Sequence, residues 1–107
     1  MAKMNDIRFL ARETAKEISG SPRDWLRYLD TASRLYRYPF SDTLLIYAQR
    51  PGATAVASME IWNQKMYRWI KKGSKGIALI DNTSGPKTKL RYVFDVQDTY
   101  KVKNLGR

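Results

Sequence analysis

A chain of 107 residues with a net charge of +10 and no cysteine or histidine has a narrow range of possible chemistry. Its length fits one domain, and an apolar content of 43% supports one modest core. The missing cysteine excludes disulfides and thiolate zinc sites, and the missing histidine removes the usual general base and the commonest metal ligand. We therefore expect a folded, non-enzymatic domain with no metal and no cofactor.

The basic charge is concentrated in the second half of the chain. Residues 62–107 contain eleven Lys and Arg against three Asp and Glu, whereas residues 1–61 contain nine against seven. Such a surface indicates a polyanionic partner, with nucleic acid first and an anionic membrane second, although basic charge can also serve solubility alone. The N-terminus lacks the apolar segment of a signal peptide and no run approaches a membrane span, so we expect a cytoplasmic protein with no membrane partner.

Helical patterns occupy the first third of the chain. Apolar spacing predicts a first helix from Asn5 to Ser19, ended by Gly20 as its C-cap. The following "SPRD" supplies a capping residue, Ser21, and then a proline at the first helical position, which predicts a second helix to about Tyr36. The residues expected to share one face of the second helix are Trp25, Leu29, Ala32 and Tyr36.

Two shorter helices follow. Pro39 ends the second helix, and Ser41 or Asp42 is expected to cap a third helix, "TLLIYAQ", which is apolar nearly all round and therefore buried. After a turn at "RPGA", the segment "TAVAS" predicts a short strand. Ser58 then opens a fourth helix that ends near Lys65.

Strand patterns begin at residue 67. "YRWI" and "GIALI" predict two strands, and "KKGSK" between them predicts the tight turn of a hairpin. After a turn at "DNTSGPKTK", the segment "LRYVFDV" predicts a strand in which Tyr92 and Phe94 face one way and Arg91, Val93 and Asp95 the other. Helices followed by a small antiparallel sheet define an α+β fold.

The segment "WIKKGSKG" poses the question of a phosphate-binding loop. It does not match the pattern of a nucleotide-binding P-loop, which lies between a strand and a helix, because strands are predicted on both sides. A turn explains the glycines: Gly73 can adopt positive φ, and Gly76 permits a bulge or a close backbone approach. Three lysines then project near the turn.

Aromatic and basic residues alternate along the second half of the chain, as in "YRW", "RY" and "YK". Sites for single-stranded nucleic acid combine cations for phosphates with aromatic faces for bases, each stacked base contributing about 1–3 kcal/mol. The alternative is that the aromatics belong to the core, which we expect for Trp25, Trp62 and Phe94. The predicted phosphate-binding residues are Lys65, Arg68, Lys71, Lys72, Lys75 and Arg91, and the predicted stacking residues are Tyr67, Trp69 and Tyr92.

Two points remain open at this stage. Tyr67 and Trp69 share one strand face, while Met66 and Ile70 share the other, and either pair can point to the core. Asp95 and Asp98 can bind a divalent ion or act as an acid/base pair, but their spacing places them on opposite faces of an ideal strand. We therefore expect them to cap a turn or to pair with Arg91 or Lys101.

Three motifs resemble a known family. The segments "FSDTLLIYAQRPGATAVASMEIWNQ", "WIKKGSKGIALI" and "YVFDVQDT" occur in order and resemble the N-terminal domain of the antirestriction protein ArdC family, in the version found in large proteins of Firmicutes conjugative transposons. The similarity covers about residues 20–100. It implies an α+β domain that binds single-stranded DNA with little sequence preference. The HExxH protease motif of the second ArdC domain is missing, so no protease activity is implied.

Together, these patterns predict one domain over residues 1–107. It comprises an N-terminal helix at 1–20, an ArdC-like core at 21–100, and a basic segment at 101–107 that is a tail or the truncation point of a longer protein. The expected function is single-stranded DNA binding within a mobile-element protein. The alternatives are a protein-interaction module that docks an acidic partner or another domain of its parent protein, and RNA binding.

Overall fold

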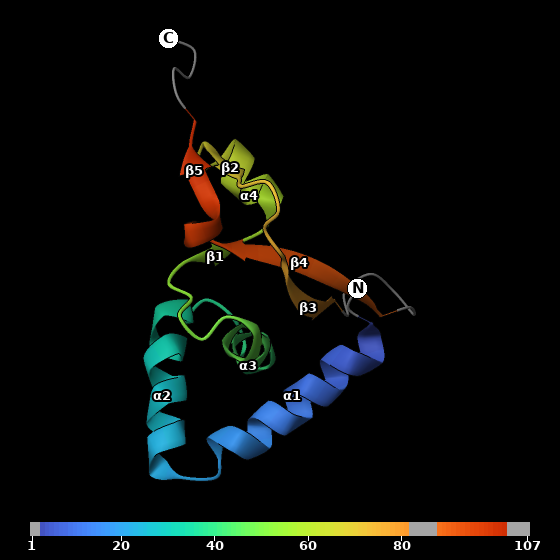
Figure 1. Cartoon of the computed structure of the whole chain (residues 1–107), viewed down its shortest axis with the longest axis vertical. Coiled ribbons are helices and arrows are strands. Elements are labelled where there is room, and N and C mark those ends of the chain that lie inside the picture. The colour runs from blue at the N-terminus through green and yellow to red at the C-terminus, as the bar shows by residue number, and fades with distance from the viewer. Residues whose placement is uncertain (1–2, 82–87, 103–107) are drawn as a thin grey trace.

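The computed structural model describes residues 3–81 and 88–102, and its helices pack against small antiparallel sheets as predicted for an α+β fold (Figure 1). The helical elements are α1 (Met4–Ile18), α2 (Pro22–Ala32), η1 (Ser33–Leu35), α3 (Phe40–Gln49), α4 (Met59–Gln64) and η2 (Val96–Asp98). The strands are β1 (Val56–Ala57), β2 (Arg68–Ile70), β3 (Ile77–Asp81), β4 (Lys89–Asp95) and β5 (Thr99–Lys101). Most of the turn expected at 81–89 and of the tail at 101–107 lies outside the described residues.

The strands form two separate sheets, and the predicted hairpin between "YRWI" and "GIALI" is wrong. One sheet has the order β1-β4-β3, and β2 pairs with β5 in a separate two-stranded ribbon. All pairs are antiparallel, and β3 and β4 are aligned from Ile77 opposite Val93 to Asp81 opposite Lys89. The apolar β3 is drawn to the core, where its first three residues are buried, whereas β2 exposes its central tryptophan. Local alternation therefore identified both strands but not their partners.

Two of the helix starts agree with the sequence. The Ser21 hydroxyl accepts a hydrogen bond from the backbone N–H of Asp24 at 3.1 Å, and the Ser58 hydroxyl accepts one from Ile61 at 3.3 Å. Each bond satisfies a backbone donor that the first turn of a helix leaves free. These caps depend only on residues three positions apart, which explains why the sequence predicts them.

Two other predicted helix boundaries are wrong. Neither Ser41 nor Asp42 caps α3, because the extended Pro39 precedes the helix and its carbonyl accepts the backbone N–H groups of Asp42 and Thr43. At the end of α1 the C-cap is Ser19 and not Gly20. The Ser19 hydroxyl donates to the carbonyl of Ala15 at 2.7 Å. The backbone N–H of Ser19 donates to the same carbonyl at 3.3 Å, so Ser19 ends the helix without a left-handed glycine.

The buried face of α2 also differs from the prediction. Trp25, Leu29 and Tyr36 are exposed, so the expectation that Trp25 lies in the core is wrong. The helix instead buries Tyr28 and Thr31. The Thr31 hydroxyl donates a hydrogen bond to the carbonyl of Pro51. Because that hydroxyl has a partner, a polar residue is tolerated inside. The helix also tightens to a 3₁₀ turn after Ala32, which ends the regular spacing before Tyr36.

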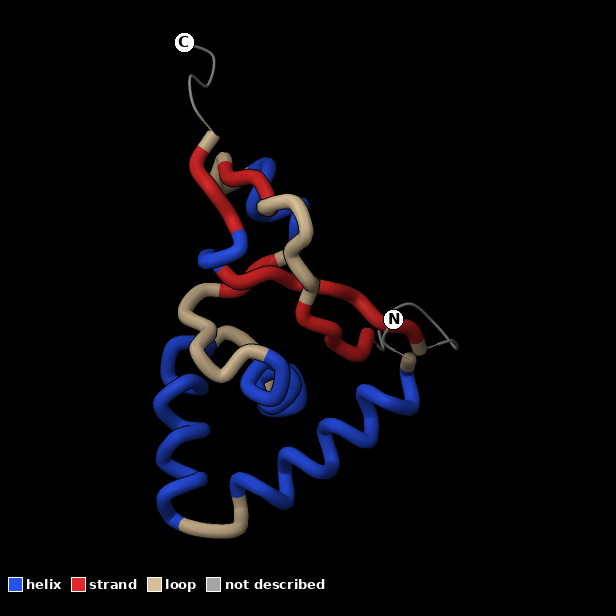
Figure 2. Tube along the Cα trace, in the orientation of Figure 1, coloured by secondary structure: helices blue, strands red, loops and turns tan. Residues whose placement is uncertain are grey.

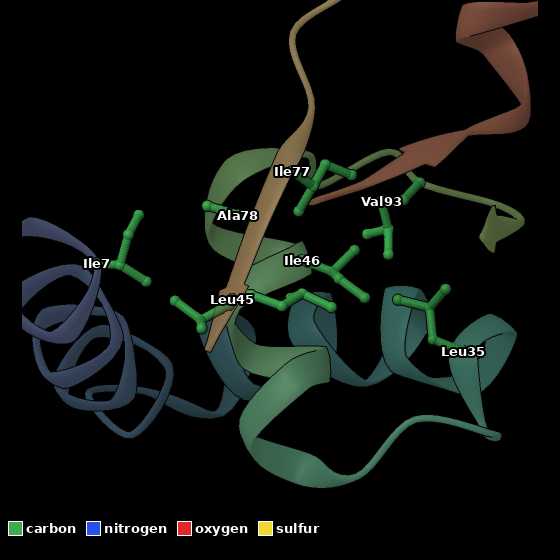
Figure 3. Close-up of a cluster of buried hydrophobic side chains, with 9 residues drawn as sticks. Ile7, Leu35, Leu45, Ile46, Ile77, Ala78 and Val93 are labelled. Atoms are coloured by element: carbon green, nitrogen blue, oxygen red, sulfur yellow. The ribbon is translucent and has the colours of Figure 1, made fainter. Parts of the chain in front are cut away.

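Helix α3 lies at the centre of the core (Figure 3). Leu45 and Ile46 pack with Ile7 from α1, Leu35 from η1, and Ile77, Ala78, Leu79 and Val93 from the sheet. On another side, Leu44 packs with Ile18 and Tyr28. The predicted burial of "TLLIYAQ" is confirmed for Thr43 to Ile46, because this helix has neighbours on several sides, whereas residues 47–49 are half-buried. Trp62 is buried as expected, whereas Phe94 is only half-buried.

The end of α3 covers the free edge of the sheet. β3 is an edge strand, and its outward-facing backbone groups need partners. The Gln49 side chain supplies a donor and an acceptor to Ala78. Its amide donates to the Ala78 carbonyl and its oxygen accepts the Ala78 N–H, each at 2.9 Å. This pairing fixes the distance between the helix and the sheet. None of the helices in residues 3–81 and 88–102 is long and apolar enough to span a membrane.

Both aspartates of "FDVQD" have structural partners. Asp95 is 0% exposed, and its carboxylate accepts hydrogen bonds from the backbone N–H groups of Thr54, Ala55 and Gln97, so the predicted capping of a turn is confirmed. Asp98 pairs with Arg50 through two contacts of 2.6 and 3.1 Å, and not with Arg91 or Lys101. No group of three potential metal-ligating side chains occurs in the described part of the chain.

Replacement of Asp95 tests whether this buried carboxylate organises the loop before β1. In Asp95→Ala, three backbone donors lose their acceptor, and we expect the free energy of unfolding to fall by about 2–4 kcal/mol. Asp95→Asn keeps one oxygen acceptor, so we expect it to lose less. Urea denaturation of both variants measures the difference. Equal stability of Asp95→Ala and the wild type would contradict this role.

Candidate nucleic-acid interface

An aromatic pair lies on the exposed face of the β2–β5 ribbon. Trp69 of β2 is directly opposite Tyr100 of β5 in the strand register, so both side chains leave the same face. Trp69 is 45% exposed and Tyr100 is 49% exposed. The ribbon and α4 lie together at the end of the molecule opposite α1 and α2 (Figures 1 and 2). This end therefore presents two aromatic surfaces to solvent.

Neither pair of residues around β2, Tyr67 with Trp69 or Met66 with Ile70, points into the core. Tyr67 and Trp69 are exposed, Met66 is exposed as well, and Ile70 is half-buried. Tyr67 precedes β2 with a φ of +55°, a left-handed conformation that is unfavourable for a bulky residue. Its carbonyl accepts the backbone N–H of Val102 at 3.2 Å, which holds this backbone in place. Neither aromatic belongs to the hydrophobic core.

The lysine-rich connector, defined as residues 71–76, joins the two sheets. Lys71 is anchored, because its backbone N–H donates to Asp98 at 2.8 Å and its Nζ donates to the carbonyl of Gln97 at 3.0 Å. Gly73 has a φ of +86°, which confirms the predicted turn glycine. Lys72 and Lys75 are exposed and have no ion pair among the described residues. The connector therefore carries two lysines without an ion pair among the described residues, after an anchored Lys71.

A further exposed aromatic packs against the other end of this connector. Tyr92 lies on β4 and is exposed, and its Cβ lies only 3.0 Å from the position that a side-chain carbon on Gly76 would take. The predicted close approach at Gly76 is thus confirmed. Trp69 precedes the lysine-rich connector and Tyr92 packs on its last residue, although the two aromatics belong to different sheets.

The structure gives both predicted arginines protein partners. The Arg68 guanidinium donates to the hydroxyl of Thr99 at 2.6 Å, and its register places it on the ribbon face opposite Trp69. Arg91 pairs with Asp42 of α3 at 3.0 Å. Lys65, at the end of α4, is exposed. The lysines and aromatics thus form the accessible part of the predicted site, and phosphate binding by the two arginines stays a prediction.

Sequence reasoning did not place Met59, Asn63 or Tyr100 in the site. With Trp69 and Ile70 they line a groove of about 350 Å³ between α4 and the ribbon. The repeated aromatic-basic pattern at "YK" was a signal for Tyr100. No signal existed for Asn63, because its place in the groove depends on how α4 packs against β2.

The fold and this surface define a small, basic α+β protein with an exposed aromatic and cationic face. No protein-family model matches the chain, and neither a curated protein nor a solved structure matches it.

The close approach at Gly76 leads to a matched pair of glycine substitutions. In Gly76→Ala the new carbon meets Tyr92 at 3.0 and 3.1 Å, so we expect a loss of about 1–3 kcal/mol in the free energy of unfolding. Gly52→Ala meets nothing within 4 Å and is expected to be neutral or slightly stabilising. Urea denaturation compares them, and equal effects would contradict the packing of Tyr92 on the connector.

The Arg91–Asp42 pair leads to a pH-dependent prediction. Burial raises the pKa of Asp42 above its ordinary value, and the charge of Arg91 opposes this rise. Replacing Arg91 by methionine should therefore raise the pKa further, which carbon NMR of the Asp42 carboxyl can measure. A carboxyl whose pKa is higher in the folded than in the unfolded protein destabilises the fold as pH rises and the group ionises. The loss in the free energy of unfolding of Arg91→Met should therefore be small at pH 3 and about 1–2 kcal/mol at neutral pH. An unchanged Asp42 pKa would contradict the coupling.

Proposed function

We propose that this chain is a non-enzymatic module that binds single-stranded DNA with little overall sequence preference. The observation that carries the proposal is the exposed Trp69–Tyr100 pair next to the lysine-rich connector. The exposed apolar surface of two neighbouring aromatic side chains contributes burial free energy only when a partner covers it. Bases of an unpaired strand supply such a partner because every base has a flat face.

The connector lysines account for the other half of the ligand. Lys72 and Lys75 are exposed and free of ion pairs among the described residues, and Lys65 adds a further exposed cation at the end of α4. Phosphates that approach these groups release condensed counterions, so affinity falls with salt concentration. Because Lys71 is held by Gln97 and Asp98, the start of the connector is already ordered, which reduces the entropy lost when a strand binds there.

An unpaired strand suits this surface better than a duplex. Stacking on Trp69 or Tyr100 requires an unstacked base, which a duplex supplies only at the cost of opening it. The choice of DNA over RNA is supported by the resemblance to the ArdC N-terminal domain. The same resemblance supports a place within a larger protein of a conjugative transposon or plasmid.

A second candidate function is favoured by α2. Trp25, Leu26 and Leu29 are exposed on this helix, and a groove of about 1020 Å³ beside it includes Arg23 and Arg27. The groove also includes Asp30, which pairs with Arg34. Apolar side chains beside two arginines suit an acidic protein partner or another domain of a parent protein. This surface is formed by α2, whereas the lysine-rich connector joins β2 to β3, so the two functions can be tested separately.

Charge reversal of the connector tests the proposed function. In Lys71→Glu, Lys72→Glu, Lys75→Glu, the reversal of three connector charges should weaken binding of single-stranded DNA at low salt by about 10- to 100-fold. The slope of log affinity against log salt concentration should become shallower by the equivalent of about two to three phosphate contacts. Fluorescence anisotropy across a salt series measures both quantities.

The matched control is Arg8→Glu, Arg12→Glu, Lys16→Glu, which makes the same change in net charge on the exposed side of α1. It should reduce affinity far less, because only the remote field changes. Duplex DNA and RNA are measured in parallel, and weaker binding of duplex is expected. Equal losses of affinity for single-stranded DNA in both triple variants would contradict the proposal. So would a wild type that binds no nucleic acid, and either result would favour the protein-interaction module.

A further inference from the structure

Tyr67 occupies a backbone conformation that the turn after α4 uses and that a tyrosine disfavours. Helix α4 ends with Lys65 as its C-cap, and β2, which packs against the same helix, begins at Arg68. The chain turns in the few residues between them, and Tyr67 there has a φ of +55°. No other non-glycine among the described residues has a positive φ. Glycine, and sometimes asparagine, usually fills such a position after a helix, because a left-handed conformation crowds the Cβ of other residues.

The side chain of Tyr67 contributes little to the fold. It is 57% exposed, and within the described part of the chain it has no hydrogen bond, aromatic contact or cation–π contact. A bulky residue in the left-handed region costs free energy, and such strain concentrates at binding sites. Stability alone therefore favours a glycine here, and the tyrosine ring is available to a partner outside the chain.

The neighbours of Tyr67 indicate which partner this is. Trp69, the stacking residue of the proposed function, lies two residues further on, so the two Cα atoms are at most about 7 Å apart. Lys65 lies two residues before Tyr67 and is exposed. The lysine-rich connector follows the other end of β2. Tyr67 and Lys65 therefore extend the aromatic and cationic surface of the ribbon at the end of β2 opposite the connector.

On the basis of the proposed function, we propose that the strained Tyr67 is a separate stacking residue for a base next to the one on Trp69. In a regular strand the two side chains would share one face, but the left-handed backbone at Tyr67 interrupts that row. The hydrogen bond from the Val102 N–H to the Tyr67 carbonyl, at 3.2 Å, holds this backbone before a strand binds. Folding and binding thus favour different residues at position 67, and relief of the strain stabilises the protein while weakening its binding of DNA.

The test replaces Tyr67 by glycine, leucine and phenylalanine and measures affinity for an oligothymidine strand by fluorescence anisotropy. Tyr67→Gly relieves the strain and removes the ring, so its midpoint of urea denaturation should rise slightly while its affinity falls about five- to fiftyfold. No cation is lost, so the slope of log affinity against log salt concentration should stay unchanged. Tyr67→Leu keeps the strain without the ring and should lose similar affinity, whereas Tyr67→Phe keeps the ring and should bind as the wild type does.

The matched control is Tyr36→Gly. Tyr36 follows η1 and is 78% exposed, but it has an ordinary φ of −60° and lies outside the ribbon. Its replacement by glycine removes the contact with Arg37 and adds freedom to the unfolded chain. We therefore expect the urea midpoint of Tyr36→Gly to fall and its affinity for the oligothymidine strand to stay unchanged.

The outcomes separate this inference from the proposed function. Wild-type affinity in Tyr67→Gly or in Tyr67→Leu overturns the stacking role of Tyr67 while leaving single-strand binding by the ribbon intact. A urea midpoint that falls in Tyr67→Gly as it does in Tyr36→Gly overturns the opposition between folding and binding at this position. Failure of the wild type to bind the strand overturns the proposed function and this inference with it. Tyr67→Leu decides the stacking role even if Tyr67→Gly does not fold.

Discussion

The burial of α3 is the constraint on which the rest of the structure depends. A helix that is apolar nearly all round is stable only when neighbours cover each side, and α1, α2 and the three-stranded sheet provide this cover. Its polar ends are used as well. Asp42 pairs with Arg91 of β4 at one end, and at the other Gln49 satisfies β3 and Arg50 pairs with Asp98 of η2. One helix therefore sets the positions of both sheets.

The same constraint explains why the aromatic surface exists. β3 is the more apolar strand, and its burial against α3 stabilises the fold. β2 is then left to pair with β5, whose start is fixed by η2 and its Arg50 contact. Because the ribbon lies outside the core, the face that carries Trp69 and Tyr100 stays about half exposed beside α4. The lysine-rich connector spans the gap between the two sheets for the same reason.

Residue patterns predicted much of the local structure and part of the site. The fold class, the caps at Ser21 and Ser58, and the turn at Gly73 all followed from neighbouring residues. The sequence also predicted a close approach at Gly76, but only the fold shows that Tyr92 makes it. The face of α2 did not, because a hydroxyl with a distant carbonyl partner made Thr31 acceptable inside. The cationic and aromatic residues of the site were identifiable from the sequence. The sequence could not show that Arg68 is hydrogen-bonded to Thr99 whereas Lys72 is exposed to solvent.

By itself, the sequence determined the features that arise within a few residues: the periods of helix and strand, the caps, the turn glycine and the excess of basic charge. Tertiary structure alone decided which strands pair, that Trp69 is exposed, and that Asn63 and Tyr100 line one groove. Local preferences depend on sterics and hydrogen bonds between near neighbours, which the chain encodes directly. Pairing and exposure result from competition among distant segments for one core, and no single segment contains that outcome.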